Sequence, residues 1–321
     1  MIQVFLQAEG NPLTSFLPLA LVLVVMYLFF FLPQIKKQKE GYQTRYDIFK
    51  QQEERSEGVK ANKIILWHQT FKQMSGNSHH HEGFNLLAPQ PVSIYRRRDT
   101  YLDVVVPQEL LVRVTKIDCL DAVQALQSVD FTHVAVLCMA NPNKPGGYVK
   151  QGVDSQEEDI FRRTDMGRYT SQYLLGEGYP LSETHQTVMV QKGVTIMRGT
   201  ELEGYPFLTD VPAPITVISV AVLKKPRTET KQGTTNRMYS TGETRLDMML
   251  RIRLVLHAVI ESGCTAVVLS AFGCGLGGHP PEEVALLFKK EIYRVGSKLP
   301  FIYFAVMDDK YQDLSLQNNY E

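Results

Sequence analysis

Short, uninterrupted apolar runs in the second half of the chain constrain its fold most strongly. Residues Ile215–Val222 read ITVISVAV, and Thr265–Ala271 read TAVVLSA. Runs of this length without polar alternation are typical of strands that are buried on both faces, as in parallel sheets covered by helices. Similar runs predict four further strands, at Leu102–Val106, Val134–Met139, Val194–Met197 and Phe301–Met307.

Helical periodicity separates these strands. It is present at 156–163, 244–262 and 281–295. A buried sheet needs helices on each side, so the pattern predicts an α/β fold, a three-layer α/β/α sandwich with a mixed sheet. Ligands of such folds bind beyond the carboxyl ends of the strands. The loops that follow Val134–Met139 and Thr265–Ala271 are therefore the places to look for a site.

The N-terminal part has a different character. Residues Phe16–Leu32 are apolar and uncharged, and lysines follow at 36, 37 and 39. This length suits a bilayer, and lysines after the span place the rest of the chain in the cytoplasm. None of the four cysteines forms a C-x-x-C pair, which fits a reducing compartment. We expect a single-pass membrane protein with a short extracytoplasmic tail (1–11), a transmembrane helix (12–33), a linker (34–44) and one cytoplasmic domain (45–321).

The stretch Met26–Glu40, MYLFFFLPQIKKQKE, resembles YajC, the small single-span accessory subunit of the bacterial secretion translocon. The resemblance covers residues 1–40 only. It leaves open a membrane adaptor that uses a translocon-like anchor.

Charge and histidine content exclude two further classes of function. The chain has 34 basic and 34 acidic residues, and Arg96–Arg98 is its one hint of a basic cluster, so no nucleic-acid partner is expected. The segment GNSHHHEG at 76–83 contains three adjacent histidines. Adjacent side chains do not converge on one ion from a regular element, so we expect a solvated loop, no metal site and no cofactor.

The first loop carries two glycines and a pair of glutamates. Gly146 and Gly147 allow a ligand to approach the backbone closely, and Gln156-Glu157-Glu158 opens the helix that follows. Ser155 and Glu158 also fit the S-x-x-E pattern of a capping box, which gives the glutamates a purely structural interpretation. Neighbouring helical residues point about 100° apart, so at most one of the two acts directly on a bond.

The second loop, Ser270–Val284, has glycines at 273, 275, 277 and 278 before a helix that Pro280 and Pro281 open. Backbone N–H groups of such a turn bind phosphate oxygens. The pattern G-x-G-x-x-G also fits, as in a Rossmann dinucleotide site. Only one strand remains after this loop, however, which leaves no second half for a nicotinamide. Phe272 suits either ligand contact or the core.

Taken together, the two loops resemble the microbial-type poly(ADP-ribose) glycohydrolase family of the macrodomain superfamily. Its signature is a Gly-Gly-Gly run, a spacer and Gln-Glu-Glu; here Pro145-Gly146-Gly147-Tyr148 precedes Gln156-Glu157-Glu158, and SAFGCGLGGHPPEEVA and FAVMDD follow in family order. The resemblance spans roughly 130–310. Tyr148 stands in place of the third glycine, which puts turnover more than binding in question.

The resemblance implies a hydrolase that cleaves ADP-ribose O-glycosidic linkages, with ADP-ribose or an ADP-ribosylated protein as its partner. Glu158 would be the general acid and base, Glu157 would position the distal ribose and Gln156 would orient the loop. The alternative is a macrodomain that binds ADP-ribose without turnover. The residues implied in substrate binding are Asn141, Gly146, Gly147, Tyr148, Gln156, Phe272, Gly273, Cys274, Gly275, Leu276 and Gly277.

Overall fold

The structure is a computed structural model. It describes residues 55–75, 86, 88–96, 111–170, 179, 181, 186–295 and 301–307. The chain divides into two compact units, 1–59 and 60–321. All strands described below belong to the second unit, as does the helix at 55–74 from residue 60 onward. The predicted boundary at residue 45 lies outside the described residues and stays a prediction.

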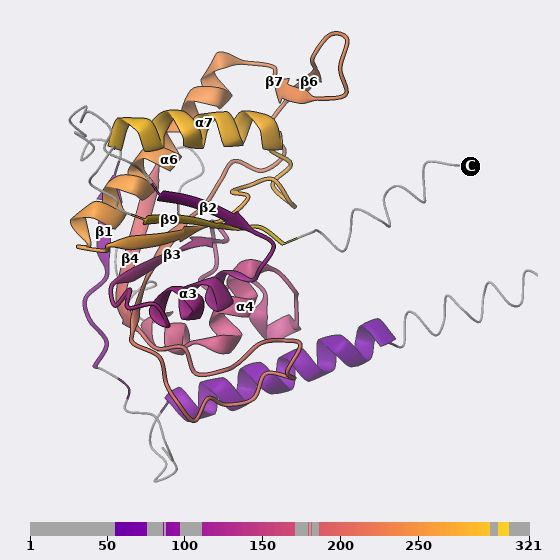
Figure 1. Ribbon diagram of the computed structural model, residues 1–321. Coiled ribbons are helices and arrows are strands. Elements are labelled where there is room, and N and C mark those ends of the chain that lie inside the picture. Colours follow the sequence, from indigo (N-terminus) through magenta and orange to yellow (C-terminus); the bar gives the residue numbers. More distant parts are fainter. Residues whose placement is uncertain are drawn as a thin grey trace, which may run out of the picture. The chain divides into compact units, whose positions relative to one another are not determined.

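A mixed, mostly parallel sheet forms the centre of the second unit (Figure 1). The order of its seven strands is β1-β4-β5-β3-β8-β9-β2. The five strands from β5 to β2 are parallel, β4 is antiparallel to β5, and β1 is antiparallel to β4. The strands are β1 (Ser93–Arg96), β2 (Leu111–Thr115), β3 (Val134–Met139), β4 (Thr187–Val194), β5 (Ile215–Val220), β8 (Ala266–Leu269) and β9 (Phe301–Ala305).

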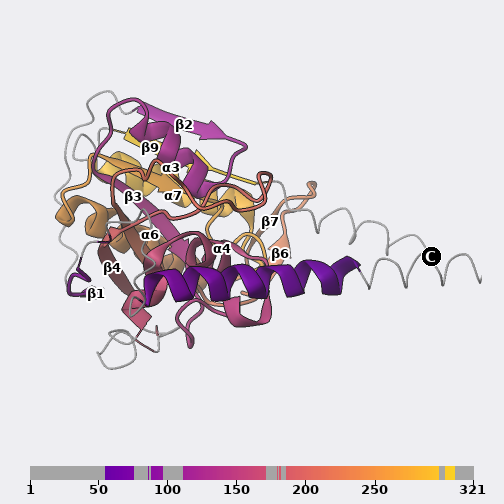
Figure 2. The same ribbon diagram turned by 90° about the horizontal axis from the view of Figure 1, so that it is seen from below.

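Helices cover the sheet on both faces. α6 (Gly242–Glu261) and α7 (Pro281–Val295) lie on one face; α3 (Cys119–Gln127), α4 (Gln156–Arg163) and residues 60–74 lie on the other, as Figures 1 and 2 show from two directions. Two short 3-10 helices, η3 (Val149–Gln151) and η4 (Asp165–Tyr169), flank α4.

The alternation of side chains along β3 accounts for this arrangement. Val134, Val136 and Cys138 join the core beneath α3 and α4, whereas Ala135 and Leu137 join the core beneath α6 and α7. A strand that contributes to two cores has no polar face. This is why its sequence reads as a continuous apolar run.

The strand predictions were right in the centre of the sheet and poor at its edge. The run at 134–139 forms β3. The runs predicted at 215–222, 265–271 and 301–307 form β5, β8 and β9, and each of these strands is shorter than predicted. The predicted strand Val194–Met197 is wrong. The strand β4 ends at Val194, which pairs with Ile215; beyond it, Ile196 and Arg198 form isolated antiparallel bridges with Thr164 and Phe207 instead of a strand. The strand predicted at Leu102–Val106 lies outside the described residues.

The prediction of a single-pass membrane protein with a cytoplasmic domain needs correction. In the part of the chain that the structure describes, no helix has both the length and the apolar character needed to cross a bilayer. The run at 12–33 that carried the prediction lies outside that part. So do the predicted tail at 1–11, the linker at 34–44 and the histidine loop at 76–83.

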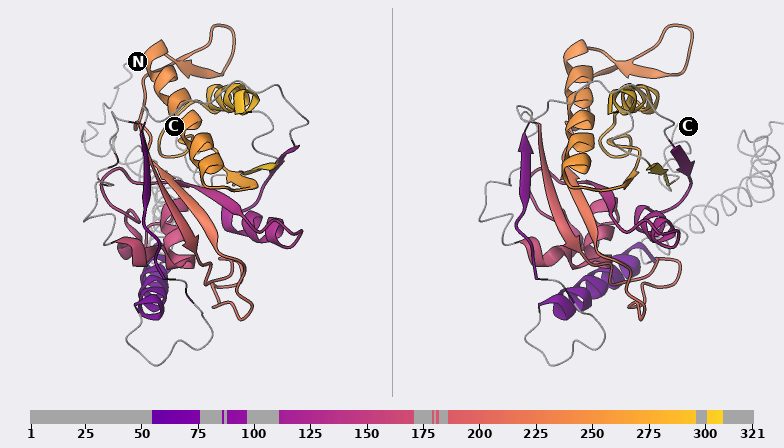
Figure 3. Two further views of the ribbon diagram at one scale, coloured as in Figure 1. Left: turned by 90° about the vertical axis from the view of Figure 1, so that its left-hand side faces the viewer. Right: turned by 60° about the vertical axis from the view of Figure 1, so that its left-hand side comes forward.

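A second, two-stranded antiparallel sheet is formed by β6 (Thr228–Thr230) and β7 (Arg237–Tyr239). It is separate from the main sheet, and its tip projects away from the layers (Figures 1 and 3). Sequence reasoning did not predict this hairpin, because its short strands carry mostly polar residues.

Candidate active site

The strands β3 and β8 separate at their carboxyl ends. Their pairing ends at Val136 and Val268. Beyond that point the side chain of Gln156 replaces β8: its Oε1 accepts from the N–H of Met139 (2.9 Å), and its Nε2 donates to the carbonyl of Leu137 (2.9 Å). Gln156 thus satisfies the open side of the strand, and its two bonds fix the start of α4 against β3.

Glu157 is buried beneath the first loop, with 3% of its surface exposed. Its Oε2 accepts from the N–H of Asn141 (2.7 Å) and its Oε1 from the N–H of Gly146 (2.9 Å). Burial raises the pKa of Glu157 to about 8, although both N–H donors and the charge of Lys224 oppose the shift. This carboxyl therefore holds its proton close to neutral pH.

Glu158 is as deeply buried but held differently. Its Oε1 accepts from the N–H of Tyr148 (2.8 Å), and its Oε2 accepts from the hydroxyl of Ser155. The predicted capping box is wrong, because the Ser155 side chain makes no capping bond to the start of α4. One oxygen of Glu158 is thus bound by the backbone, and the other only by a hydroxyl that can rotate.

The glycines of the first loop are required by this packing. Gly147 has φ of 54°, and a Cβ there would collide with Oε1 of Glu158; a Cβ on Gly146 (φ 73°) would lie 2.6 Å from the Phe161 ring. Tyr148 needs no such freedom. Its φ is −113°, its side chain is 42% exposed, and Lys144 Nζ lies 4.7 Å above its ring. A tyrosine at the third position therefore leaves the N–H that binds Glu158 in place.

A buried ionic network fixes the far end of α4. The fully buried guanidinium of Arg163 contacts Asp118 (2.7 Å) and Asp121 (2.6 Å) on or next to α3. Beside it, Arg162 donates to the carbonyl of Val153 (2.7 Å), at the end of the first loop. Removing one partner of such a buried pair typically costs about 3–5 kcal/mol, so α4 is firmly placed. Sequence reasoning missed this network, because its partners are more than forty residues apart.

The second loop turns from β8 into α7 with free backbone donors. Its own bonds run from Cys274 N–H to Ala271, from Gly278 N–H to Gly275 and from His279 N–H to Gly273. Within the described residues, the N–H groups of Gly273, Gly275, Leu276 and Gly277 donate to no protein group. Consecutive free N–H groups at the start of a helix form an anion-binding turn.

His279 holds this turn in place. Its ring is buried; Nε2 lies 2.6 Å from the carbonyl of Leu223, and Nδ1 lies 2.7 Å from the hydroxyl of Tyr239. The carbonyl requires a proton on Nε2, so Nδ1 accepts from the Tyr239 hydroxyl. Burial lowers the pKa of His279, which favours this neutral form. A Cβ on Gly273 would lie 2.8 Å from the ring, which explains the glycine there.

The remaining predicted site residues differ in accessibility. Leu276 is 86% exposed at the rim of the turn, whereas Phe272 is fully buried in the core beneath α6 and α7, so Phe272 acts as a core residue. Burial raises the pKa of the Cys274 thiol to about 11, so it is a poor nucleophile. The oxygen Oδ1 of Asn141 accepts from the N–H groups of Asn143 and Lys144 and so shapes the first loop.

One side of the second loop borders an apolar cavity. The cavity has a volume of about 500 Å³ and lies between α7 and the strands β9 and β2, and it meets the loop at Ser270, Ala271 and Cys274. Among the described residues, no group of His, Cys, Asp and Glu side chains is arranged to hold a metal ion.

The comparison with protein families decides the assignment. The family described as microbial-type PARG, catalytic domain, matches residues 34–195, which is half of the chain and includes both glutamates. The chain belongs to this family. PARG stands for poly(ADP-ribose) glycohydrolase, and the chain is accordingly a PARG-like glycosidase, a hydrolase. Of the curated proteins, none matches it, and no comparison supports the likeness of residues 1–40 to the translocon subunit.

Solved structures of bacterial PARGs share the fold. The chain resembles the enzyme of Thermomonospora curvata bound to the inhibitor ADP-HPD, with 18% identity and a TM-score of 0.59 over 78% of this chain and 95% of that one. It also resembles the Deinococcus radiodurans enzyme in complex with ADP-ribose, with 19% identity and a TM-score of 0.53 over 70% of this chain and 91% of that one. The share of this chain that these structures cover, 78% and 70%, is larger than the half that the family model matches.

Proposed function

We propose that this PARG family member hydrolyses ADP-ribose O-glycosidic linkages, with Glu158 as the general acid and base. The observation that carries the proposal is the pair of buried carboxylates at the carboxyl end of β3. In this pair, the Ser155 hydroxyl is the only group among the described residues that binds Oε2 of Glu158. A ligand oxygen can replace that hydroxyl without breaking any backbone contact.

The reaction needs one proton donor that becomes an acceptor. The protonated Glu158 gives its proton to the leaving ribose oxygen as the glycosidic bond breaks. The resulting carboxylate then takes a proton from the water that attacks the anomeric carbon. The N–H of Tyr148 holds Oε1 during both steps, which keeps Oε2 directed at the reacting atoms.

Glu157 supports the site rather than transferring the proton. Both of its oxygens already accept a backbone N–H, so it ties Asn141 and Gly146 to α4. Each oxygen keeps a second lone pair, and the distal ribose hydroxyl can donate to it. This assigns Glu157 to positioning both the loop and the sugar.

The second loop would hold the diphosphate. The free N–H groups of Gly275, Leu276 and Gly277 are consecutive, as the donors of phosphate-binding turns are. A bound diphosphate also brings negative charge near the oxocarbenium-like transition state, which is positive. The partner is therefore ADP-ribose, either as the end of a polymer or attached to a protein.

The test is ADP-ribose release by the full chain from poly(ADP-ribose) and from mono-ADP-ribosylated protein. We expect Glu158→Gln to lower the rate by about 100- to 10,000-fold, the usual loss when a general acid is removed. Its affinity for ADP-ribose should stay close to that of wild type. Glu261→Gln, at the exposed end of α6, is the matched control and should be fully active.

Two results would contradict the proposal. If Glu158→Gln releases ADP-ribose as fast as wild type, Glu158 only anchors the loop. If wild type binds ADP-ribose but releases none from either substrate, the chain is a binding module. Tyr148 gives no support to that second result, because its side chain is exposed and its backbone makes the required contact.

A further inference from the structure

We propose that residues 224–237, called here the basic hairpin, bind the chain of a poly(ADP-ribose) substrate outside the active site. The proposal rests on the proposed function and adds the form of the substrate to it. The segment contains five basic residues and one acidic residue, Glu229, in a protein that has 34 basic and 34 acidic residues in total. The basic residues are Lys224, Lys225, Arg227, Lys231 and Arg237.

The basic hairpin is joined to the diphosphate-binding turn. The N–H of Lys225 donates to the carbonyl of Gly277 (2.8 Å), and Arg237 Nη2 donates to the carbonyl of Gly278 (3.2 Å). The Tyr239 hydroxyl, just after the hairpin, contacts His279 of the same turn. These contacts place the base of the hairpin directly beside the residues that would hold the first diphosphate.

Positive charge continues from the glutamates to the hairpin tip. Lys224 is close enough to Glu157 to lower the pKa of that carboxyl, and Arg227 and Lys231 extend the charge outward along β6. Arg227 and Lys231 flank the three residues of β6 and are four steps apart, a span of about 13 Å in an extended chain. A single ADP-ribose carries one diphosphate, which the turn can hold. Cations this far outside the turn suit the diphosphates of further units.

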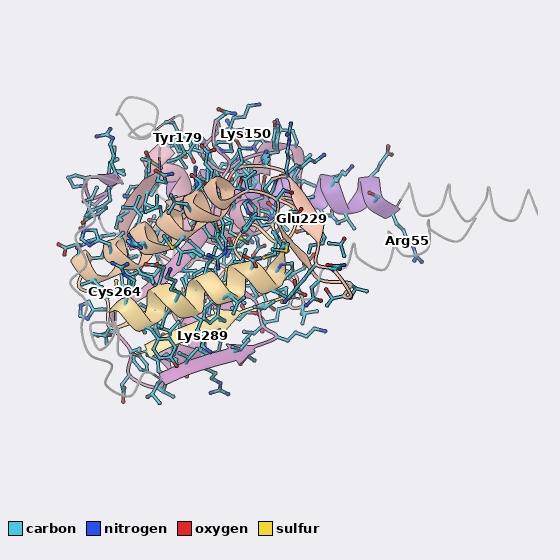
Figure 4. The ribbon with its side chains drawn as sticks, turned by 90° about the horizontal axis from the view of Figure 1, so that it is seen from above. Arg55, Lys150, Tyr179, Glu229, Cys264 and Lys289 are labelled. Atoms are coloured by element: carbon cyan, nitrogen blue, oxygen red, sulfur yellow. The ribbon has the colours of Figure 1, made fainter. Side chains whose placement is uncertain are left out.

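The views of the molecule agree with this placement. The hairpin projects beyond the helical layers in Figures 1 and 3. The contacts of Lys225 and Arg237 with the loop that follows β8 place the hairpin on the side of the carboxyl ends. Figure 4 agrees with this, because Glu229 on the hairpin lies far from Cys264, which precedes β8.

The hairpin is built to contact a polyanion and little else. All five basic side chains are exposed, and no described protein group pairs with those of Arg227 and Lys231. The nearby Glu283 is already paired with Arg245 (2.7 Å). The contacts between the hairpin and the diphosphate-binding turn therefore favour the polymer that the active site would cut.

The test compares two doubly neutralised proteins. Arg227→Gln with Lys231→Gln removes two charges from the hairpin. Lys289→Gln with Lys290→Gln removes two exposed charges from α7, about 12 Å along the helix from its start. Neither pair touches the glutamates or the diphosphate-binding turn. The KM and kcat for poly(ADP-ribose) and the Kd for ADP-ribose are measured for both variants and wild type between about 50 and 200 mM salt.

We expect the hairpin variant to raise the KM for the polymer while kcat and the Kd for ADP-ribose stay unchanged. Two lost phosphate contacts should lower the slope of log affinity against log salt by about 1.4. Wild type should therefore lose about sevenfold more polymer affinity than the hairpin variant over this salt range. The α7 variant should behave like wild type.

The possible failures are distinguishable. Equal KM values in all three proteins, or equal losses in both variants, overturn the hairpin site and leave the proposed function intact. Single-stranded DNA of equal charge is added as a competitor. If its inhibition constant equals the Kd for poly(ADP-ribose), the hairpin is a general polyanion site and the polymer assignment is wrong. If wild type releases no ADP-ribose, the proposed function fails; direct polymer binding by the same three proteins then decides the hairpin separately.

Discussion

Replacing Glu157 by Gln separates its role as a loop anchor from any role as an acid. The two side chains have the same shape, but the carboxyl can accept at both oxygens and the amide at only one. In the protein, Oε2 accepts from Asn141 N–H and Oε1 from Gly146 N–H. The amide nitrogen of the variant must face one of these donors. A buried donor left without an acceptor costs about 1–3 kcal/mol, so we expect the free energy of unfolding at pH 5 to fall by that amount.

The pH dependence of this effect has a definite sign. The pKa of Glu157 is about 8 in the folded protein, against 4.5 as the ordinary value of a glutamate. Between these values the folded state holds a proton that the unfolded state has lost, so this group stabilises most at low pH, and its contribution falls as the pH rises. From pH 5 to pH 7 wild type should lose roughly 2–3 kcal/mol that the variant, which has no carboxyl, does not lose. The deficit of the variant should therefore shrink or reverse by pH 7.

Urea denaturation of wild type, Glu157→Gln and the control Glu261→Gln at pH 5, 6 and 7 measures this difference. Other titrating groups are common to wild type and Glu157→Gln and cancel in the comparison. A difference between these two proteins that is constant with pH would show that Glu157 does not titrate with a raised pKa. A deficit that grows with pH would mean that the two N–H donors outweigh burial and hold the pKa down, which would refute the reasoning.

Three further substitutions test the loops. Gly147→Ala should lower turnover at least tenfold in an ADP-ribose release assay, because the added Cβ displaces Glu158. It should also lower the free energy of unfolding by about 1–2 kcal/mol in thermal unfolding, because alanine disfavours the left-handed backbone. Gly275→Val should weaken ADP-ribose binding by at least tenfold in calorimetry, roughly 1.4 kcal/mol, with an unchanged melting temperature. Tyr239→Phe leaves Nδ1 of His279 without its donor, so it should cost about 1–3 kcal/mol of stability and raise the Kd for ADP-ribose more than it changes kcat.

Much of the sheet was predictable because its signal is local. A strand such as β3, buried between two helical layers, must be apolar at every position, and a continuous run records that requirement directly. The same holds for glycines in both loops, which stand where a side chain would collide with a carboxylate or with the His279 ring. Edge strands need not be apolar at every position, so they show no continuous apolar run. The residues of β2 are largely exposed, and its five residues, LVRVT, include a charge, so it lacks the continuous apolar run of the central strands.

The contacts that position the site were not predictable, because they join distant parts of the chain. Arg163 reads as an ordinary charged residue at the end of a helix, yet it is fully buried against Asp118 and Asp121. His279 reads as a loop residue, yet Tyr239 and Leu223 determine its tautomer from two other segments. Composition and spacing contain no information on such partners. They emerge only when the fold brings the segments together.

The glutamate pair shows why structural and chemical interpretations of one motif need not compete. Reasoned from the sequence, Glu158 is either a helix cap or an acid. In the structure it is no cap: it binds the N–H of Tyr148 and the hydroxyl of Ser155, and so fastens the loop to α4. That fastening is also what a general acid needs, because a carboxyl held at one oxygen presents the other in a fixed direction. The neighbouring Glu157, bound at both oxygens, fixes the same loop more rigidly and has less freedom to meet a substrate. The division of labour that we propose for the two glutamates rests on which oxygen each has left to offer.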